Sequence, residues 1–183
     1  KLVNLCNESQ GVTEGEEGLE MAGKDTQDNF PTFPTSLQVA HDDLLLIGDN
    51  KGVTRAYKIS SGDAYLVLDP RKAETYKRGT EVASVSQLGY FNCQVSSSEP
   101  TLTRCIFVGH EDGRIMVYDF SGSLVQYLEG SEGALLKMEM AETMEVLLCL
   151  LAGNNLVWAW DLSTGLAQVL DFNREYQALN QGQ

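Results

Sequence analysis

From Ser36 onward, short apolar runs of four to eight residues alternate with turns rich in Gly, Asp, Asn and Ser. These runs are rich in Val, Ile, Leu, Tyr and Phe, the residue types that favour β-strands. Within Leu135–Met140, apolar and polar residues alternate in places, as in a strand with one buried face. Val146–Ala152 is apolar throughout, which is typical of a strand covered on both faces. The pattern predicts an all-β domain over about residues 36–172.

Residues 1–35 are polar and acidic and show no apolar period. Glu14–Gly18 holds three acidic residues and two glycines, so it cannot bury enough apolar surface to offset the entropic cost of ordering. We therefore predict an acidic, mostly disordered tail or loop over residues 1–35, without regular structure at 7–32 and with a strand end at Lys1–Cys6. Residues 173–183 are predicted to form a linker or tail.

Three segments of the chain repeat one pattern, at residues 48–62, 109–122 and 153–165. Each follows an apolar run, contains a tight turn and continues as a strand that ends in an aromatic residue. A large aromatic side chain at that place can fill the space between adjacent sheets. Repeats of about 40 residues are typical of four-stranded units. The three aromatic residues are Tyr57, Tyr118 and Trp160.

The tight turn of each repeat needs a residue with positive φ, which glycine adopts without steric cost. Gly52 and Gly113 occupy this place in the first two repeats, and Asn155 replaces them in the third. We interpret each as a two-residue turn between neighbouring strands.

The repeats resemble the WD-repeat β-propeller family. The third repeat carries the Trp160-Asp161 ending typical of that family, and the second has Tyr118-Asp119 there, with Asp112 in the preceding turn. The resemblance implies a β-propeller whose four-stranded antiparallel blades lie at about residues 36–69, 81–129 and 134–172. The residues that would carry the blade motif are Gly52, Tyr57, Asp112, Gly113, Tyr118, Asp119, Trp160 and Asp161.

The repeats also depart from the family pattern. Family members often hold each blade with a His–Ser/Thr–Asp–Trp hydrogen-bond network, and no repeat here has all four members. Lys51 and Asn154 stand where the second repeat has its turn aspartate, and Ser131 stands in the usual His place. Between the first two strand-end aromatic residues the chain is longer than a blade requires, and we assign the surplus to insertions at 70–78 and 96–100.

The number of blades raises the question of closure. Propellers typically close a ring of four to eight blades. Three blades would leave two apolar sheet faces uncovered, and a soluble monomer rarely exposes such surface. We therefore expect the chain to belong to a larger or partner-completed ring. It would be a fragment of a longer protein, a chain with missing segments, or a subunit completed by a partner, and a start at Lys1 favours the first two.

Composition narrows the function. The 26 acidic and 13 basic residues give a net charge of −13, which argues against a nucleic-acid footprint, because phosphate contacts need clustered Lys and Arg. No apolar run approaches the roughly 20 residues of a membrane helix, so no membrane insertion is expected. The four cysteines and two histidines lack zinc-site spacing, and we predict no metal and no cofactor. Four free thiols in a reducing compartment are favoured over a disulfide framework.

Candidate chemistry is sparse. His41, followed by Asp42 and Asp43, and His110, followed by Glu111, stand in predicted turns, and we interpret both as solvated turn residues. The sequence contains no nucleophile elbow and no phosphate-binding loop. No catalytic or cofactor-binding residue is therefore predicted, and the chain is not expected to be an enzyme.

One basic cluster contrasts with the acidic chain. The simpler interpretation of this cluster is a solvated insertion loop. The alternative is an electrostatic contact with an acidic partner. The residues of the candidate partner contact are Arg71, Lys72, Tyr76, Lys77 and Arg78.

The repeats and the sparse chemistry favour a non-catalytic protein–protein interaction scaffold within an intracellular multiprotein complex, in the cytoplasm or the nucleus. Its partners would be other proteins, as subunits of a larger complex. Two alternatives stay open. The chain could be the propeller portion of an enzyme whose catalytic domain lies elsewhere, or a purely structural subunit completed by neighbouring chains.

Overall fold

All the described strands belong to one unit of the chain, within residues 32–183. Most of the predicted disordered segment 7–32, the predicted strand end Lys1–Cys6 and the predicted tail 173–183 lie outside the described residues. The computed structural model describes residues 31–40, 43–73, 81–96, 99–129, 133–141, 145–153 and 156–171. The strands are β1 (Pro34–Ala40), β2 (Leu44–Asp49), β3 (Thr54–Lys58), β4 (Ala64–Leu68), β5 (Val85–Ser96), β6 (Glu99–His110), β7 (Ile115–Tyr118), β8 (Leu124–Leu128), β9 (Leu135–Ala141), β10 (Val146–Leu151), β11 (Leu156–Asp161) and β12 (Leu166–Asp171), and a 3-10 helix, η1, spans Pro70–Lys72.

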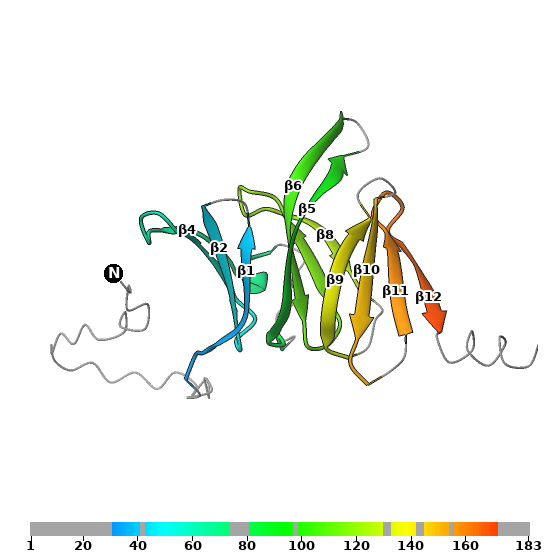
Figure 1. The fold of residues 1–183 in the computed structure, drawn as a ribbon, viewed down its shortest axis with the longest axis horizontal. Helices are drawn as coiled ribbons and strands as arrows, with labels where there is room; N and C mark the ends of the chain where they lie inside the picture. The colour runs from blue at the N-terminus through cyan, green and yellow to red at the C-terminus, as the bar shows by residue number, and fades with distance from the viewer. Residues whose placement is uncertain are drawn as a thin grey trace, which may run out of the picture. The chain divides into compact units, whose positions relative to one another are not determined.

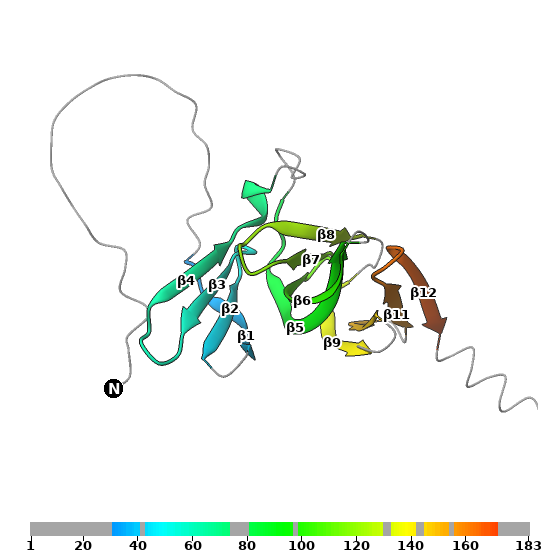
Figure 2. The same cartoon turned by 90° about the horizontal axis from the view of Figure 1, so that it is seen from above.

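The strands form three four-stranded sheets, β1–β4, β5–β8 and β9–β12, named here blades 1, 2 and 3 (Figure 1). Every pairing within a blade is antiparallel and joins consecutive strands. The first strands of neighbouring blades lie close together, β1 near β5 and β5 near β9 (Figure 2). The predicted all-β fold of four-stranded antiparallel blades is confirmed.

The hairpin turns between the second and third strands differ from the prediction. In blade 1 the Asp49 amide donates to the Val53 carbonyl at 3.0 Å, and the Gly52 amide donates to the Asp49 carbonyl at 3.1 Å. Three residues therefore lie between the bonded pair, and Gly52 has a φ of 76°. Blade 2 repeats this pattern over His110–Arg114, where Gly113 has a φ of 86°. A type I turn followed by one left-handed residue gives such a loop, so the glycines are confirmed and the two-residue turns are wrong in blades 1 and 2. Asn155, which was predicted for the third turn, lies outside the described residues.

The core lies in two layers between the blades. Successive side chains of a strand point to opposite faces of its sheet, so the consecutive apolar residues of blade 2 serve both layers. The first interface, between blades 1 and 2, buries Leu46, Leu68, Leu88, Ile106, Met116 and Tyr118, among others. The second interface, between blades 2 and 3, buries Phe107, Val117, Leu135, Leu147, Cys149 and Trp160, among others.

Neighbouring blades approach closely at a glycine near the end of the second strand. A Cβ atom on Gly48 would lie 2.4 Å from Cγ1 of Val85, the first residue of β5. A Cβ atom on Gly109 would lie 2.5 Å from Cδ1 of Leu135, the first residue of β9. Both distances are far below the roughly 3.5–4.0 Å of a normal carbon–carbon contact. The absence of a side chain at these two positions therefore sets the spacing between blades.

Blade 3 does not have a glycine at this position. In the pairing of β6 with β7, Gly109 lies opposite Ile115. Ile115 is three residues before the strand-end Tyr118, and Val157 is three residues before the strand-end Trp160. Leu150 lies opposite Val157, so Leu150 is the equivalent of Gly109. The three repeats, as aligned in the sequence, instead begin with Gly48, Gly109 and Gly153. The pairing of β10 with β11 therefore shows that this alignment is offset by three residues at the start of the third repeat.

The first blade begins at Pro34, two residues before the predicted start of the blades. This difference brings Thr35 into β1. The Thr35 hydroxyl donates to the Val85 carbonyl at 2.6 Å, and so links blade 1 to blade 2. A second link joins blades 2 and 3, where the side-chain amide of Gln126 donates to the Leu162 carbonyl at 3.2 Å.

The hairpin of β5 and β6 is longer than the other hairpins. Each of its strands has 12 residues, and their pairing continues to Ser96 opposite Glu99. The hairpin extends beyond the neighbouring strands (Figure 1). Within the predicted insertion at 96–100, Ser96 and Glu99 therefore lie on the two strands of a β-hairpin, and residues 97–98 lie outside the described residues. The predicted insertion at 70–78 begins with η1, and residues 74–78 lie outside the described residues.

Strand β10 is covered on one face only within the described residues. Its side chains alternate between buried and exposed, and Leu148 and Leu150 are 37% and 40% exposed. The prediction that Val146–Ala152 is covered on both faces is wrong for this structure. Continuous apolarity shows what the strand can bury, whereas its actual burial depends on which sheet packs against it.

We expect Gly48→Ala to lower the free energy of unfolding by about 1–3 kcal/mol, because the added methyl group overpacks the first interface against Val85. Denaturant-induced unfolding would measure the change. The double variant Gly48→Ala, Val85→Gly is the matched control, since it removes the Val85 side-chain atoms Cβ, Cγ1 and Cγ2 that the added methyl group would meet. The double variant should lose less free energy of unfolding than the two single variants lose in total. Strictly additive losses would contradict the close approach of Gly48 and Val85.

Candidate interaction surfaces

Two aspartates of the predicted blade motif hold the turns between the third and fourth strands. Asp161 Oδ1 accepts hydrogen bonds from the amide and the hydroxyl of Ser163 at 2.9 and 2.6 Å. Asp119 Oδ1 accepts the same pair from Ser121, also at 2.9 and 2.6 Å. Hydrogen bonds from Ser163 and Thr164 hold the pKa of Asp161 below its usual range, because they stabilise the charged carboxylate. These side chains therefore shape the turns between β7 and β8 and between β11 and β12.

In blade 1 this role passes to a residue that sequence reasoning missed. Lys58 stands where the other repeats have the motif aspartate. Asp43, which precedes β2, instead accepts hydrogen bonds from the amide and the hydroxyl of Ser60 at 2.7 and 2.8 Å. These hydrogen bonds, with a smaller contribution from the charge of Lys58, lower the pKa of Asp43. The retained serine at position 60, two residues after the absent aspartate, was the only sequence signal for this brace.

The turn between the second and third strands has its own acidic brace. In blade 2, Asp112 Oδ2 accepts a hydrogen bond from Nε of Arg114 at 2.6 Å. The aligned repeats place Lys51 at the matching position of blade 1. The structure shows Asp49 in this role: its Oδ1 accepts the Lys51 amide at 2.9 Å and its Oδ2 lies 2.5 Å from Nη1 of Arg55. Sequence alignment missed Asp49 because it lies two residues earlier, at the end of β2.

The strand-end aromatic residues Tyr57, Tyr118 and Trp160 lie on β3, β7 and β11, the third strands of their blades. Tyr118 is buried in the first interface and Trp160 in the second, so each faces the preceding blade. The Trp160 ring stacks on Trp158 with 5.9 Å between the ring centroids. Tyr57 pairs with Leu45 on the face of blade 1 turned away from blade 2, and it is half-buried. The same position thus fills a blade interface twice and remains partly exposed once.

The outer face of blade 1, named here the first open face, is largely apolar, and its charged side chain is Arg55, which lies opposite Ile47 and pairs with Asp49. Strand alternation places on it the side chains of Leu37, Val39, Leu45, Ile47 and Tyr57. Leu37 and Val39 are 64% and 54% exposed. None of the five belongs to either interface of the described residues.

The outer face of blade 3, named here the second open face, has the same character. Its apolar side chains are Leu148, Leu150, Val157, Ala159 and Leu170. Strand β9 adds one charged pair to this face, with Lys137 Nζ 2.8 Å from Glu139 Oε1. The described residues therefore present one apolar sheet face at each end.

The predicted basic partner contact is described only in part. Arg71 and Lys72 lie in η1, whereas Tyr76, Lys77 and Arg78 lie outside the described residues. Arg71 Nε donates to Asp69 Oδ1 at 2.8 Å, so this guanidinium serves its own turn. Lys72 borders a groove of about 470 Å³ between blades 1 and 2. The cluster therefore stays a prediction.

His110 is buried, so its interpretation as a solvated turn residue is wrong. It is the last residue of β6, and its Nδ1 lies 2.9 Å from the Ala83 carbonyl oxygen. Burial lowers the pKa of His110, and the Ala83 carbonyl and Asp112 only partly oppose this effect. The ring is thus a neutral member of the blade structure.

Cys93, Cys105 and Cys149 are free and buried, whereas Cys6 and His41 lie outside the described residues. Over the described ranges, no group of three or more His, Cys, Asp and Glu residues could hold a metal ion. No helix in the described part of the chain is long and apolar enough to cross a membrane.

No protein-family model and no curated protein matches this sequence. Among solved structures, a chain of a mitotic checkpoint complex is similar with a TM-score of 0.58 and 18% identity, over 77% of this chain and 39% of that chain. The RRP9 WD40 repeats match with a TM-score of 0.56 and 14% identity, over 75% of this chain and 38% of that chain. The computationally designed Ika4 protein matches with a TM-score of 0.53 and 17% identity, over 85% and 78% of the two chains.

This chain therefore spans about two-fifths of the length of the checkpoint-complex and RRP9 chains that it matches. At such low identity, the likeness shows the fold alone. The fold is a WD40-like arrangement of propeller blades, as the resemblance of the repeats implied.

We expect stability to fall between about pH 7 and pH 5, because His110 must take up a proton on unfolding. The unfolded histidine has a pKa of about 6.5, and the folded pKa lies below it, so protons favour the unfolded state in this window. Melting temperatures at pH 7.5 and pH 5.5 at equal ionic strength would measure the loss. The variant His110→Gln should show a smaller loss, and an unchanged pH dependence in this variant would exclude His110 as the cause.

Proposed function

We propose that this chain is a non-catalytic protein–protein interaction scaffold within an intracellular multiprotein complex, and that further blades cover its two open faces. The main support for the proposal is a comparison of two equivalent positions, one in blade 2 and one in blade 3. Phe107 pairs with Val117 and Leu148 pairs with Ala159, in each case one residue before the strand-end aromatic position of the third strand. Phe107 is 0% exposed, whereas Leu148 is 37% exposed. One position that is buried in blade 2 and open in blade 3 indicates a surface built to be covered.

The other end of the described blades gives an independent comparison. Tyr118 is buried because blade 1 packs against it, and Tyr57, its equivalent, has no blade over it in the described residues. Full burial of a large apolar side chain contributes about 1.5–3 kcal/mol. Several such side chains on each open face make a covering sheet strongly favourable, whether it comes from the same protein or from a partner.

The similar structures support this proposal through their fold. A rigid set of blades with loops at both edges suits the binding of several partners. One similar chain comes from the crystal structure of a complex, which agrees with a role in assembly. The three free cysteines favour a reducing compartment, in the cytoplasm or the nucleus. Three of the described carboxylates accept hydrogen bonds from serines of turns, and this structural use favours a non-catalytic role. They are Asp43, Asp119 and Asp161.

We expect the purified 183-residue chain to self-associate, to aggregate, or to require a partner that supplies further blades. Two exposed apolar faces drive association, and the net charge of −13 slows but does not prevent it. Sedimentation velocity over a range of concentrations would measure the species present. A single monodisperse species at the monomer mass, with a cooperative melt, would show that the chain is self-sufficient.

Variants would identify the faces responsible. Val39→Lys with Leu150→Lys adds one charge to each open face, and this double variant should shift the chain toward smaller species. Glu111→Gln with Glu129→Gln is the matched control, because it changes the net charge equally at two exposed positions next to strands of blade 2, away from both open faces. Equal effects of the open-face variant and the control would contradict an association through these faces.

A further inference from the structure

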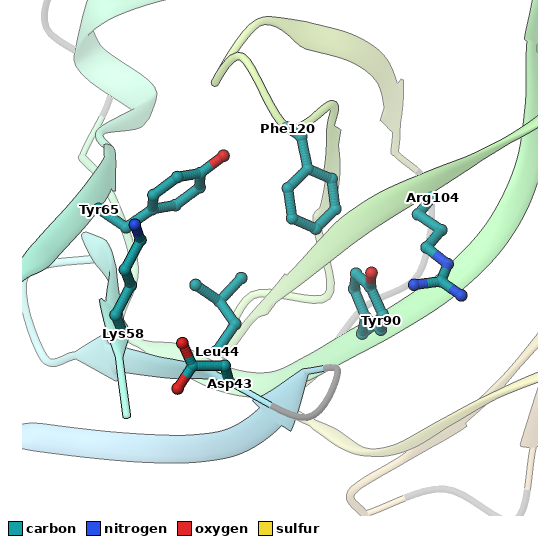
Figure 3. Close-up of a pocket in the computed structure, with 7 residues that line it drawn as sticks. All are labelled: Asp43, Leu44, Lys58, Tyr65, Tyr90, Arg104 and Phe120. Atoms are coloured by element: carbon teal, nitrogen blue, oxygen red, sulfur yellow. The ribbon is translucent and has the colours of Figure 1, made fainter. Parts of the chain in front are cut away.

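A pocket of about 370 Å³ lies between blades 1 and 2, within the size range of ligand sites (Figure 3). The unequal lengths of the blades create it. Strand β2 of blade 1 has 6 residues, whereas β5 and β6 of blade 2 have 12 residues each. The longer hairpin carries Tyr90 and Arg104 along the edge of blade 1, and the turn after β7 adds Phe120.

The walls of the pocket are apolar and largely aromatic. Leu44 is buried and contributes to the wall, and Tyr65 of β4 faces Phe120 across the opening (Figure 3). The rings of Tyr90 and Phe120 meet edge to face, with 5.6 Å between their centroids and an angle of 77°. This contact fixes two of the rings before any ligand binds, so little ordering entropy is lost on binding.

The rim of the pocket carries a net positive charge. The Arg104 guanidinium lies 6.0 Å from the centre of the Tyr90 ring, in a cation–π geometry that holds it at the pocket. Lys58 is exposed on the opposite side. The one carboxylate of the lining, Asp43, already accepts two hydrogen bonds from Ser60. Among the described residues, neither Lys58 nor Arg104 forms an ion pair.

We propose that this pocket binds an acidic peptide segment of a partner protein, which inserts one large apolar side chain between Tyr65 and Phe120. Carboxylates next to that side chain pair with Lys58 and Arg104. This inference rests on the proposed scaffold function, and it names proteins with an acidic peptide segment as one class of partner. Both walls belong to blades that already pack together, so the pocket is complete without any further blade.

The net charge of −13 opposes the approach of an acidic peptide. That repulsion acts mainly at long range, where it is screened, since the Debye length is about 8 Å at physiological ionic strength. At the pocket itself, Lys58 and Arg104 outnumber the one carboxylate of the lining, Asp43, which already accepts two hydrogen bonds from Ser60. The contact is therefore attractive at short range, and it should depend on salt less steeply than a wholly basic site would.

The first test is a fluorescence-anisotropy titration of the full chain into a labelled nine-residue peptide with one phenylalanine between two pairs of glutamates. Two matched peptides replace the phenylalanine with alanine or the four glutamates with glutamines. We expect saturable binding of the parent peptide and at least tenfold weaker binding of each matched peptide. No saturable binding, or equal binding of either matched peptide, would overturn the proposal.

Protein variants locate the binding site. Lys58→Glu with Arg104→Glu should weaken the parent peptide at least tenfold, and both side chains are exposed, so the fold should persist. The single reversals Lys58→Glu and Arg104→Glu have Lys137→Glu as their matched control, which changes the charge equally at one exposed lysine outside the pocket and should leave the Kd within twofold. Tyr65→Ala tests the apolar wall and should weaken binding about fivefold or more. An unchanged Kd in the charge-reversed or the Tyr65 variant would overturn the site.

A second measurement is photo-cross-linking, which can be read out whether the chain is monomeric or self-associated. A peptide with a photoreactive benzophenone in place of the phenylalanine ring should cross-link to Tyr65, Phe120 or their neighbours, and cross-links confined to other blades would overturn the site. This result separates the two proposals. Failure of peptide binding in a chain that still associates through its open faces contradicts the pocket alone, whereas peptide binding to a stable monomer contradicts only the need for further blades.

Discussion

Face-to-face packing of apolar sheets is the interaction on which the rest of this structure depends. Strands such as β6 bury successive residues, so both of their faces need a covering sheet. Ile106 and Phe107 are neighbours in sequence, yet one belongs to the first interface and the other to the second. Each blade is therefore stabilised by its neighbours, as in other repeat architectures, and a terminal blade keeps one face that its own sequence has made apolar.

The polar groups complement this packing at the ends of the sheets. Because the interior positions are apolar, the turns satisfy their backbone groups with nearby carboxylates, and Asp119 and Asp161 do so within their own turns. Asp43 reaches across to the turn that follows Lys58, and so it also positions one of the two cations of the pocket. In blade 1, Asp43 thus belongs both to the hydrogen bonds of the turn and to the lining of the pocket. Because the Asp43 carboxylate holds this turn, we interpret it as a structural group of blade 1.

Much of the fold could be predicted because its signals are local. Strand positions, the glycines at 52 and 113, and the place of Tyr118 and Trp160 all follow from residues close together in the chain. The misses involve distant contacts or exact spacing. Asp43 lies 17 residues from Ser60, and the pocket joins Tyr90 to Phe120 across two different hairpins. The burial of His110 and the open face of β10 depend on which sheets are neighbours, and local periodicity carries no information on that point.

The open faces and the pocket differ in the kind of partner that they select. An open sheet face is broad and apolar, so its affinity grows with the area buried and its selectivity is set by shape. The pocket is small, holds one side chain and adds two charges, so a sequence motif can satisfy it. Tyr57 and Lys58 are neighbours in β3 and serve the two surfaces from opposite faces of one sheet. A protein that covers Tyr57 therefore leaves Lys58 accessible, and completion of the blades and capture of a peptide are sterically compatible on the same molecule.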